Sequence, residues 1–467
     1  MKICCCGCGR GDFGGRLRGP YEIFSYVCRK LVPHAESYRK MMEENKEKYP
    51  LSEVLEVAAE AGHILLENGA EIARIEETME RISSHYGVTS RNFYVISNGI
   101  FMTGMSPNGT PSDRRSQYAN VEFIPIKGTQ MDKIVEVNRL SREIAAGKHS
   151  LAGAREKLAE IRAMKPKPDL EQIAGSAFGS AGFCAIFGGG IMDCCACFVV
   201  GMLLWAFVLY VTSRHFAKLL GNIISGAFAA LLCLVFWKIG FGESLGNMTV
   251  GALIPLIPGV AFTNGIRDLA NEDYLSGVTR LLDALLVFLA IAIGSCFMFI
   301  IGGQFDGEVI RLGGALSDPS TAGLLPQIVA GFVGTMGFAV LFGAPRAEYV
   351  WTGMAGALCW CSYLLAHNTI GISVFGASII AAFLTTLLAK GLAISRKCPE
   401  TVFLITGLFP LIPGGGIFWT TYFLCSSQFH SAFWSGVTAI SVTFAIVLGI
   451  VFVSGLPKHL RMARKAG

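Results

Sequence analysis

Hydrophobic and polar positions divide the chain into two unlike parts, and the pattern changes near residue 170. Before that point, apolar residues recur every three or four positions from Leu51 onward, which predicts two amphipathic helices separated near Asn68-Gly69. Segment 92–104 is rich in aromatic and β-branched residues around Asn98-Gly99, which predicts a β-hairpin or one long strand. A strand over 121–126 and helices over 131–146 and 151–164 complete an expected small α+β domain at 50–165.

After residue 170 the chain is almost continuously hydrophobic, in stretches long enough to cross a bilayer as helices. The fold class we expect is an α-helical polytopic membrane protein, preceded by the α+β domain. Residues 1–49 form a charged, cysteine-rich leader and residues 457–467 a basic tail. The ten expected spans are Ile173–Gly190, Asp193–Thr212, Leu219–Ile239, Met248–Gly265, Val278–Ile301, Leu324–Phe342, Glu348–His367, Ile372–Leu392, Val402–Cys425 and Phe433–Ser454.

The pentapeptide PLIPG interrupts two of these spans, at Pro255–Gly259 and 155 positions later at Pro410–Gly414. At the same offset, IFGGGIMD (186–193) aligns with LFGAPRAE (341–348), which places Asp193 opposite Glu348. Two matches at one offset favour an internal repeat, with five helices in 170–303 and five in 320–456. Each PLIPG alone is compatible with a simple proline kink, whereas paired interruptions are typical of a transporter's central binding site.

Composition supports a membrane protein, because 52% of the residues are hydrophobic and only 16% are charged. No nucleotide-binding P-loop, nucleophile elbow or HExxH motif occurs, so we expect no cofactor, no direct use of ATP and no nucleic-acid partner. Most of the 15 cysteines lie in apolar stretches, as small hydrophobic residues do. The cluster Cys4–Cys8 is either a thiolate metal or lipidation site or part of a disordered terminus.

The distribution of basic residues predicts the orientation. Of 39 Lys and Arg residues, 25 precede residue 170. With the α+β domain inside, twelve of the others fall in cytoplasmic loops or the tail and two in outside loops, which places both termini in the cytoplasm. Because five helices per repeat is an odd number, the second repeat is then inverted relative to the first.

The most polar stretch of the membrane half follows the first PLIPG. We expect its charged residues to crowd the cytoplasmic mouth of a transport pathway; they are Arg267, Asp268, Glu272, Asp273, Arg280 and Asp283. In the alternative interpretation, the two arginines anchor the helix ends at the inner surface and Asp268 and Asp283 neutralise them. Arg280 and Asp283 are three apart on one helix face, where an ion pair can form.

Asp193 and Glu348 each follow a Gly or Pro turn and open a helix. Each either caps that helix or carries the proton that drives transport. Together with Asp283 they are the proton-coupling candidates. The expected substrate and transport pathway comprises Pro255, Pro258, Gly259, Thr263, Asn264, Arg267, Asp268, Arg280, Asp283, Pro410, Pro413, Gly414, Thr420 and Thr421.

Several motifs together resemble the threonine/serine exporter family in its fused form. They are ENGAEIARIEETMERI (67–82), FGGGIMD (187–193), PLIPGVAFTNGIRDLANEDYLSGVTRLLDA (255–284), GAPR (343–346) and the second PLIPG. The resemblance implies a multi-pass exporter of small hydroxy amino acids in the cytoplasmic (inner) membrane, driven by the proton motive force. Relatives of the split form are associated with dicarboxylate export, so dicarboxylates are an alternative substrate. A hydrolase role has been proposed for the family's soluble domain.

Three functional classes remain open at this stage. In an exporter, the partners are a small-molecule substrate, protons and membrane lipid, and the oligomeric state is undetermined. In a membrane-tethered enzyme, residues 51–164 would be catalytic, but Glu71, Arg74, Glu76 and Glu77 supply no nucleophile with its base. A passive channel would conduct without a gradient. We favour the exporter, with the α+β domain regulating or gating it.

Overall fold

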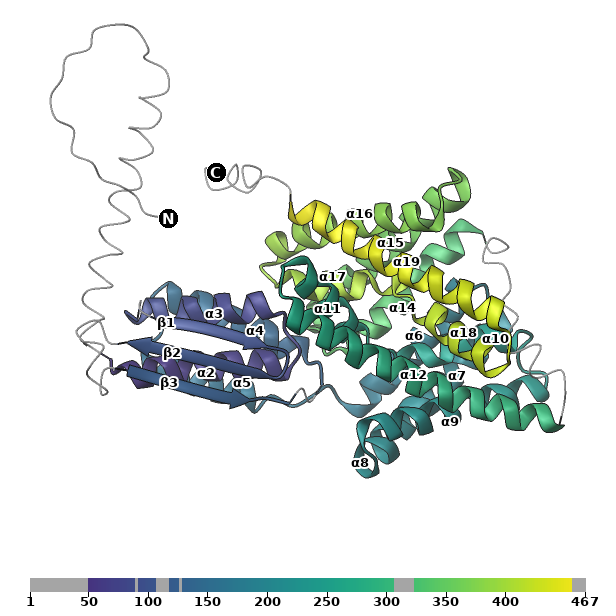
Figure 1. The fold of residues 1–467 in the computed structure, drawn as a ribbon, viewed down its shortest axis with the longest axis horizontal. Helices are drawn as coiled ribbons and strands as arrows, with labels where there is room; N and C mark the ends of the chain where they lie inside the picture. The colour runs from purple at the N-terminus through teal and green to yellow at the C-terminus, as the bar shows by residue number, and fades with distance from the viewer. Residues whose placement is uncertain (1–48, 89–90, 106–116, 126–127, 306–322, 456–467) are drawn as a thin grey trace, which may run out of the picture.

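The computed structural model describes residues 49–88, 91–105, 117–125, 128–305 and 323–455 (Figure 1). The N-terminal part (residues 49–164) contains a three-stranded sheet and lies at one end of the helical part (residues 169–455). The expected leader with its Cys4–Cys8 cluster and the expected basic tail lie outside the described residues, apart from residue 49.

The N-terminal part packs helices against an antiparallel sheet of order β1-β2-β3. The predicted hairpin is confirmed, but Ile96 pairs with Gly99, so its two-residue turn is Ser97-Asn98. The third strand ends at Phe123 instead of residue 126, because its partner strand begins at the opposing Gly99. The elements are α2 (Leu51–Glu67), α3 (Ile72–His85), β1 (Arg91–Ile96), β2 (Gly99–Met105), β3 (Gln117–Phe123), α4 (Met131–Ala145) and α5 (Leu151–Arg162).

The apolar faces of these helices form one core with the inner face of the sheet. Leu55 and Ile64 of α2, Met79 of α3 and Ile100 of β2 are fully buried there. Helix α2 lies close to its neighbours at Gly62, where an added Cβ would stand 2.6 Å from the sulfur of Met79. The amphipathic spacing of the sequence is therefore satisfied by helix and sheet packing.

In the helical part, short connections join successive helices, apart from the stretch 306–322, which lies outside the described residues. They are α6 (Asp169–Ile186), α7 (Ile191–Phe207), η2 (Val208–Thr212), α8 (Ser213–His215), α9 (Lys218–Lys238), α10 (Leu245–Leu253), η3 (Ile254–Leu256), α11 (Gly259–Ala270), α12 (Tyr274–Phe305), α14 (Leu324–Leu341), η5 (Arg346–Glu348), α15 (Tyr349–Leu364), η6 (Leu365–Thr369), α16 (Val374–Arg396), α17 (Glu400–Gly407), η7 (Phe409–Leu411), α18 (Gly414–Cys425) and α19 (Phe429–Ser454).

The chain is a multi-pass membrane protein by helix length and hydropathy. Among the described residues, six helices are long and apolar enough to cross a bilayer, and two bent helix pairs raise the number of candidate spans to eight. Two further expected spans correspond to α6 and α15, which are helical but are not among these candidates. The count of ten spans stays a prediction.

Helix boundaries recur at the 155-residue offset found in the sequence. Helices α6 and α14 begin and end 155 positions apart, and so do α11 and α18. The turns after α6 and α14 also match, because Gly188 and Gly343 both take positive φ values, of 92° and 66°. The sequence repeat is therefore also a repeat of local structure.

Helices α6 and α14 pack against each other at positions that the 155-residue offset relates. A Cβ added to Gly175 would stand 2.9 Å from the carbonyl oxygen of Gly337, and one added to Gly182 would stand 2.8 Å from that of Ala330. Gly337 is the equivalent of Gly182, and Ala330 is the equivalent of Gly175. The two helices thus run antiparallel, and small residues let their backbones approach closely.

The crossing of α9 and α12 depends on Gly294, since an added Cβ would overlap the carbonyl oxygen of Ile223. We expect Gly294→Ala to separate the two helices and to lower stability by about 1–3 kcal/mol. The measurement is the melting temperature of the purified full chain in detergent. Gly391→Ala is the matched control, because no atom lies within 4 Å of an added Cβ at Gly391 of α16. Equal melting temperatures would contradict the packing argument.

Candidate functional site

Both PLIPG segments break their helices in the same way. The bend is 69° between α10–η3 and α11, and 41° between α17–η7 and α18. In each, the α-helix ends in a 3₁₀ turn that contains the first proline. The glycine of the motif then begins the next helix, and its N–H donates to the carbonyl oxygen of the residue two positions before it. The two N···O distances are 2.8 Å from Gly259 to Ile257 and 2.7 Å from Gly414 to Ile412.

The two breaks contact one another in the interior. A Cβ on Gly259 would collide with the ring of Phe409, which directly precedes the second PLIPG, and a Cβ on Gly414 would collide with Ile257 of the first. The Phe409 ring also stacks on Phe338 at a centroid distance of 4.3 Å. Each break therefore packs against the opposite half of the helical part as well as against its own.

A cavity of about 200 Å³ adjoins the second break. Two of the predicted pathway residues, Pro410 and Pro413, line it. The remainder of its wall is mainly aromatic and aliphatic, with hydroxyl groups contributed by residues such as Tyr363, Ser378 and Thr438. Such a lining suits the apolar part of a small ligand with few polar groups.

Buried charges gather where α11 and α12 meet the N-terminal part. Arg280 lies 3.0 Å from Asp268, and their side chains are 3% and 1% exposed. Asp268 also accepts from the N–H of Ile72, at 3.4 Å, and Arg280 donates to the carbonyl oxygen of Ala70, at 2.9 Å. A buried charge needs hydrogen-bond partners in place of water. The backbone of the connection between α2 and α3 supplies them to Asp268 and Arg280.

Two further contacts fasten the same connection. Arg267 lies 2.6 Å from the carboxylate of Glu71, and both side chains are at most 10% exposed. The side-chain amide of Asn264 donates to the carbonyl oxygen of Gly69, at 2.6 Å. Residues 69–72 are therefore held by four side chains from α11 and α12, immediately after the first break.

A cavity of about 300 Å³ opens beside this connection; we call it the vestibule. Three predicted pathway residues, Asn264, Arg280 and Asp283, line it. Lys218 of α9 also lines it and pairs with Asp283 at 2.8 Å. The vestibule thus presents cations, a carboxylate and an amide, which together suit a ligand carrying both charges.

The expected ion pair between Arg280 and Asp283 is wrong. Arg280 turns to Asp268 and the N-terminal part, whereas Asp283 lies one turn further along α12 and faces Lys218. A spacing of three residues on a helix permits an ion pair. Each residue instead pairs with a group on another element, Arg280 with the buried Asp268 and the exposed Asp283 with Lys218. Spacing within one helix carries no information about those partners.

Asp193 and Glu348 occupy equivalent positions but have different partners. Asp193 accepts from the N–H groups of Gly190, Glu243 and Ser244 at 2.7–3.0 Å, which is the capping geometry that its position suggested. Glu348 pairs instead with Arg396, at 3.1 Å. Proton coupling at either residue stays a prediction.

The threonine candidates are already hydrogen-bonded in part. Thr420 and Thr421 donate to the carbonyl oxygens of Gly416 and Ile417 in their own helix. Their hydroxyl oxygens remain as acceptors for a ligand. Thr263 is 1% exposed beside Asn264, so any contact with a ligand there requires a rearrangement.

Sequence reasoning missed the part of the vestibule that comes from distant elements. Gly69, Ser97 and Asn98 of the N-terminal part line it, as does Thr279, whose hydroxyl donates to that of Ser97 at 3.0 Å. The only available signal was the turn chemistry of Asn68-Gly69 and Asn98-Gly99, which marks exposed loops but not their partners. Within the described residues, no group of three or more His, Cys, Asp or Glu side chains forms a metal site.

The fold and these contacts define a polytopic membrane protein with two broken helices and a docked N-terminal part. The chain belongs to the threonine/serine exporter family, as its motifs predicted. The family model for threonine/serine exporters matches residues 56–302, and a second one, described as threonine/serine exporter, matches residues 327–456. Together, the two matches extend over the N-terminal part and the helical part of the chain.

Two relatives are similar over most of their length. The threonine/serine exporter of Corynebacterium glutamicum is 22% identical over 417 residues, which is 87% of this chain and 83% of that protein. The "Probable threonine/serine exporter" of Mycobacterium tuberculosis is 22% identical over 378 residues, or 78% of this chain and 69% of that protein. No solved structure matches the chain.

The Glu71–Arg267 contact predicts a specific loss of stability. Removing one partner of a buried ion pair costs about 3–5 kcal/mol, whereas an exposed pair contributes about 0.2–1 kcal/mol. We therefore expect Glu71→Gln to lower the melting temperature of the purified full chain in detergent. Glu77→Gln is the control, since Glu77 is 59% exposed in its pair with Arg81. Similar effects of the two variants would count against docking through Glu71.

Glu76 predicts a pH effect at the same interface. Burial raises the pKa of its carboxyl, the N–H of Val95 lowers it, and Asp273 and Glu80 raise it further. A raised pKa in the folded state means that stability is lost as pH rises from the ordinary value through the folded one. Glu76→Gln should therefore raise the melting temperature at pH 7 but not at pH 4. A gain that is equal at both pH values would exclude titration of Glu76 as the cause.

Proposed function

We propose that this chain is a secondary exporter of threonine, serine or a similar small amino acid, driven by the proton motive force. Its family and the names of its relatives support an amino-acid substrate. The sequence offers no P-loop for direct use of ATP, and the pair of broken helices suits transport rather than catalysis. Energy would then come from a gradient.

The contact between the two breaks carries this proposal. Gly259 and Gly414 each pack against the opposite PLIPG segment, and α6 and α14 exchange equivalent contacts in antiparallel directions. These contacts support two inverted five-helix halves that rock against each other around the breaks. Such rocking exposes a site between them first to one side of the membrane and then to the other.

The N-terminal part would act as a gate at the cytoplasmic side. Its 69–72 connection lies beside the vestibule, which Gly69 lines, and is held by Asn264, Arg267, Asp268 and Arg280. In this proposal, a zwitterionic substrate enters with its carboxylate on Arg280 or Lys218 and its ammonium group on Asp283. It then moves to the breaks, where Thr420 and Thr421 offer acceptor oxygens.

The same contacts support the proposed orientation in the cytoplasmic membrane. The helix ends that contact the N-terminal part are the ends that the basic residues place in the cytoplasm, including Arg267, Arg280 and Arg346. Asp193, Asp283 and Glu348 are the carboxylates through which protons could couple. Asp283 has the most direct access, because its side chain is 52% exposed at the vestibule.

Transport by the purified chain in proteoliposomes tests the proposal. We expect L-threonine movement to follow an imposed pH step, since the gradient supplies the energy. Movement without any step would indicate a passive channel, and movement of succinate instead of threonine would indicate a dicarboxylate exporter. Pro258→Ala combined with Pro413→Ala should reduce the rate at least about tenfold, because both breaks are straightened. An unchanged rate would contradict a central site at the breaks.

A further inference from the structure

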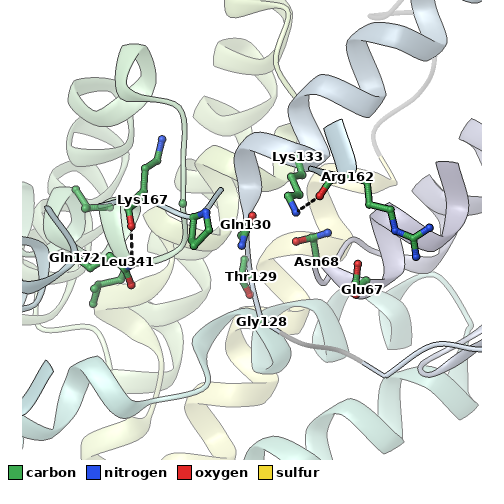
Figure 2. Close-up of a pocket in the computed structure, with 13 residues that line it drawn as sticks. Glu67, Asn68, Gly128, Thr129, Gln130, Lys133, Arg162, Lys167, Gln172 and Leu341 are labelled. Carbon is green, nitrogen blue, oxygen red and sulfur yellow. Dashed lines mark hydrogen bonds between the residues drawn. The ribbon is translucent and has the colours of Figure 1, made fainter. Parts of the chain in front are cut away.

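A third cavity, of about 340 Å³, lies at the joint between the N-terminal part and the helical part (Figure 2). We call it the joint pocket. Asn68, Thr129, Gln130 and Lys133 line it from the N-terminal part, and Gln172 and Leu341 line it from α6 and α14. None of the residues proposed for the transport pathway lines it.

Lys133 is the unusual group in this pocket. It is 8% exposed, and its ammonium group donates to the carbonyl oxygen of Arg162 at 3.0 Å (Figure 2). The other two cations of the wall have carboxylate partners, Arg162 with Glu60 at 2.7 Å and Lys167 with Asp132 at 3.5 Å. In the described part of the chain, no carboxylate lies within 4.0 Å of the Lys133 nitrogen. A buried ammonium group with one acceptor has donors left for an anion.

Acceptors complement this ammonium group. The side-chain oxygen of Gln130 is buried and has no hydrogen-bond partner among the described residues. Asn68 donates its amide to the carbonyl oxygen of Ile64 at 2.7 Å, which leaves its oxygen as an acceptor. Glu67 adds a carboxylate to the wall. The pocket therefore combines an anion-binding group with several groups that accept hydrogen bonds.

We propose that the joint pocket binds a free α-amino acid as a regulatory ligand, separately from the transport pathway. The ligand carboxylate takes the open donors of Lys133, and its ammonium group donates to the side-chain oxygens of Gln130 and Asn68. A dicarboxylate fits less well, because its second carboxylate would face these acceptor oxygens. This assignment rests on the wall of the pocket and holds whether or not the transport proposal is correct.

Because the joint pocket lies between the two parts, binding of a ligand there affects how the N-terminal part docks on the helical part. Residues 128–130 lead directly into α4, whose first N–H groups, of Met131 and Asp132, donate to the carbonyl oxygens of Phe342 and Gly343 at the end of α14. Asn68, on the other side, directly precedes the 69–72 connection, whose Gly69 lines the vestibule. An amino acid held between them stabilises the docked arrangement of the N-terminal part.

Equilibrium dialysis of radiolabelled L-threonine against the purified full chain tests this proposal. We expect Lys133→Met to abolish one binding site per chain, or to weaken it at least about 30-fold, because a buried charge contact is lost. Lys133→Arg should retain the site. Lys148→Met is the control, since Lys148 is exposed in the same part of the chain. L-threonine amide, which lacks the anionic carboxylate, should bind at least one site fewer than L-threonine does, and Lys133→Met should leave the binding of the amide unchanged.

Each result separates the regulatory site from the transport proposal. Loss of one site in Lys133→Met, with threonine counterflow in proteoliposomes intact, supports the joint pocket. The same number of sites in wild type and Lys133→Met, or equal numbers for threonine and its amide, would overturn it. Absence of threonine counterflow in the wild type would refute the transport proposal. The comparison of threonine binding between wild type and Lys133→Met would still test the joint pocket. If Lys133→Met does not fold, the number of L-threonine sites in Gln130→Leu and the number of amide sites in the wild type test the proposal instead.

Discussion

A helix that is interrupted inside a bilayer leaves backbone groups that lipid cannot satisfy, and this constraint organises the structure. Both PLIPG breaks are buried against the opposite half, where Gly259 meets Phe409 and Gly414 meets Ile257. Neither half buries its own break alone. The packing of the two breaks against each other satisfies this requirement, and the cavity of about 200 Å³ adjoins the second break.

The N-terminal part is joined to this framework by polar contacts as well as by apolar ones, such as that of Met131, which lies in the hydrophobic core of the helical part. Glu71, Asn264 and Arg280 are buried and bonded across the joint, and the first N–H groups of α4 cap the end of α14. Charged contacts of this kind are costly to bury and costly to leave unpaired. They suit a contact that has two defined arrangements, closed and open, better than a permanent apolar interface does.

Two polar cavities flank the 69–72 connection and differ in their electrostatics. The vestibule has both charges on its wall, with Lys218 and Asp283 already paired, and opens next to the first break. The joint pocket has the singly bonded ammonium group of Lys133 and lies away from the breaks. One short connection, residues 69–72, separates them.

The sequence by itself determined the membrane class, the family and the positions of both helix breaks, because each depends on local composition or on a pattern within one segment. It favoured a repeat at an offset of 155 residues, and it left a hairpin and one long strand both open. The sequence also identified Asn264, Arg280 and Asp283, which line the vestibule. Only the tertiary structure decided their partners, including Asp268 for Arg280, Lys218 for Asp283 and Glu71 for Arg267. An ion pair forms with the nearest opposite charge in space, and periodicity along one helix does not contain that distance.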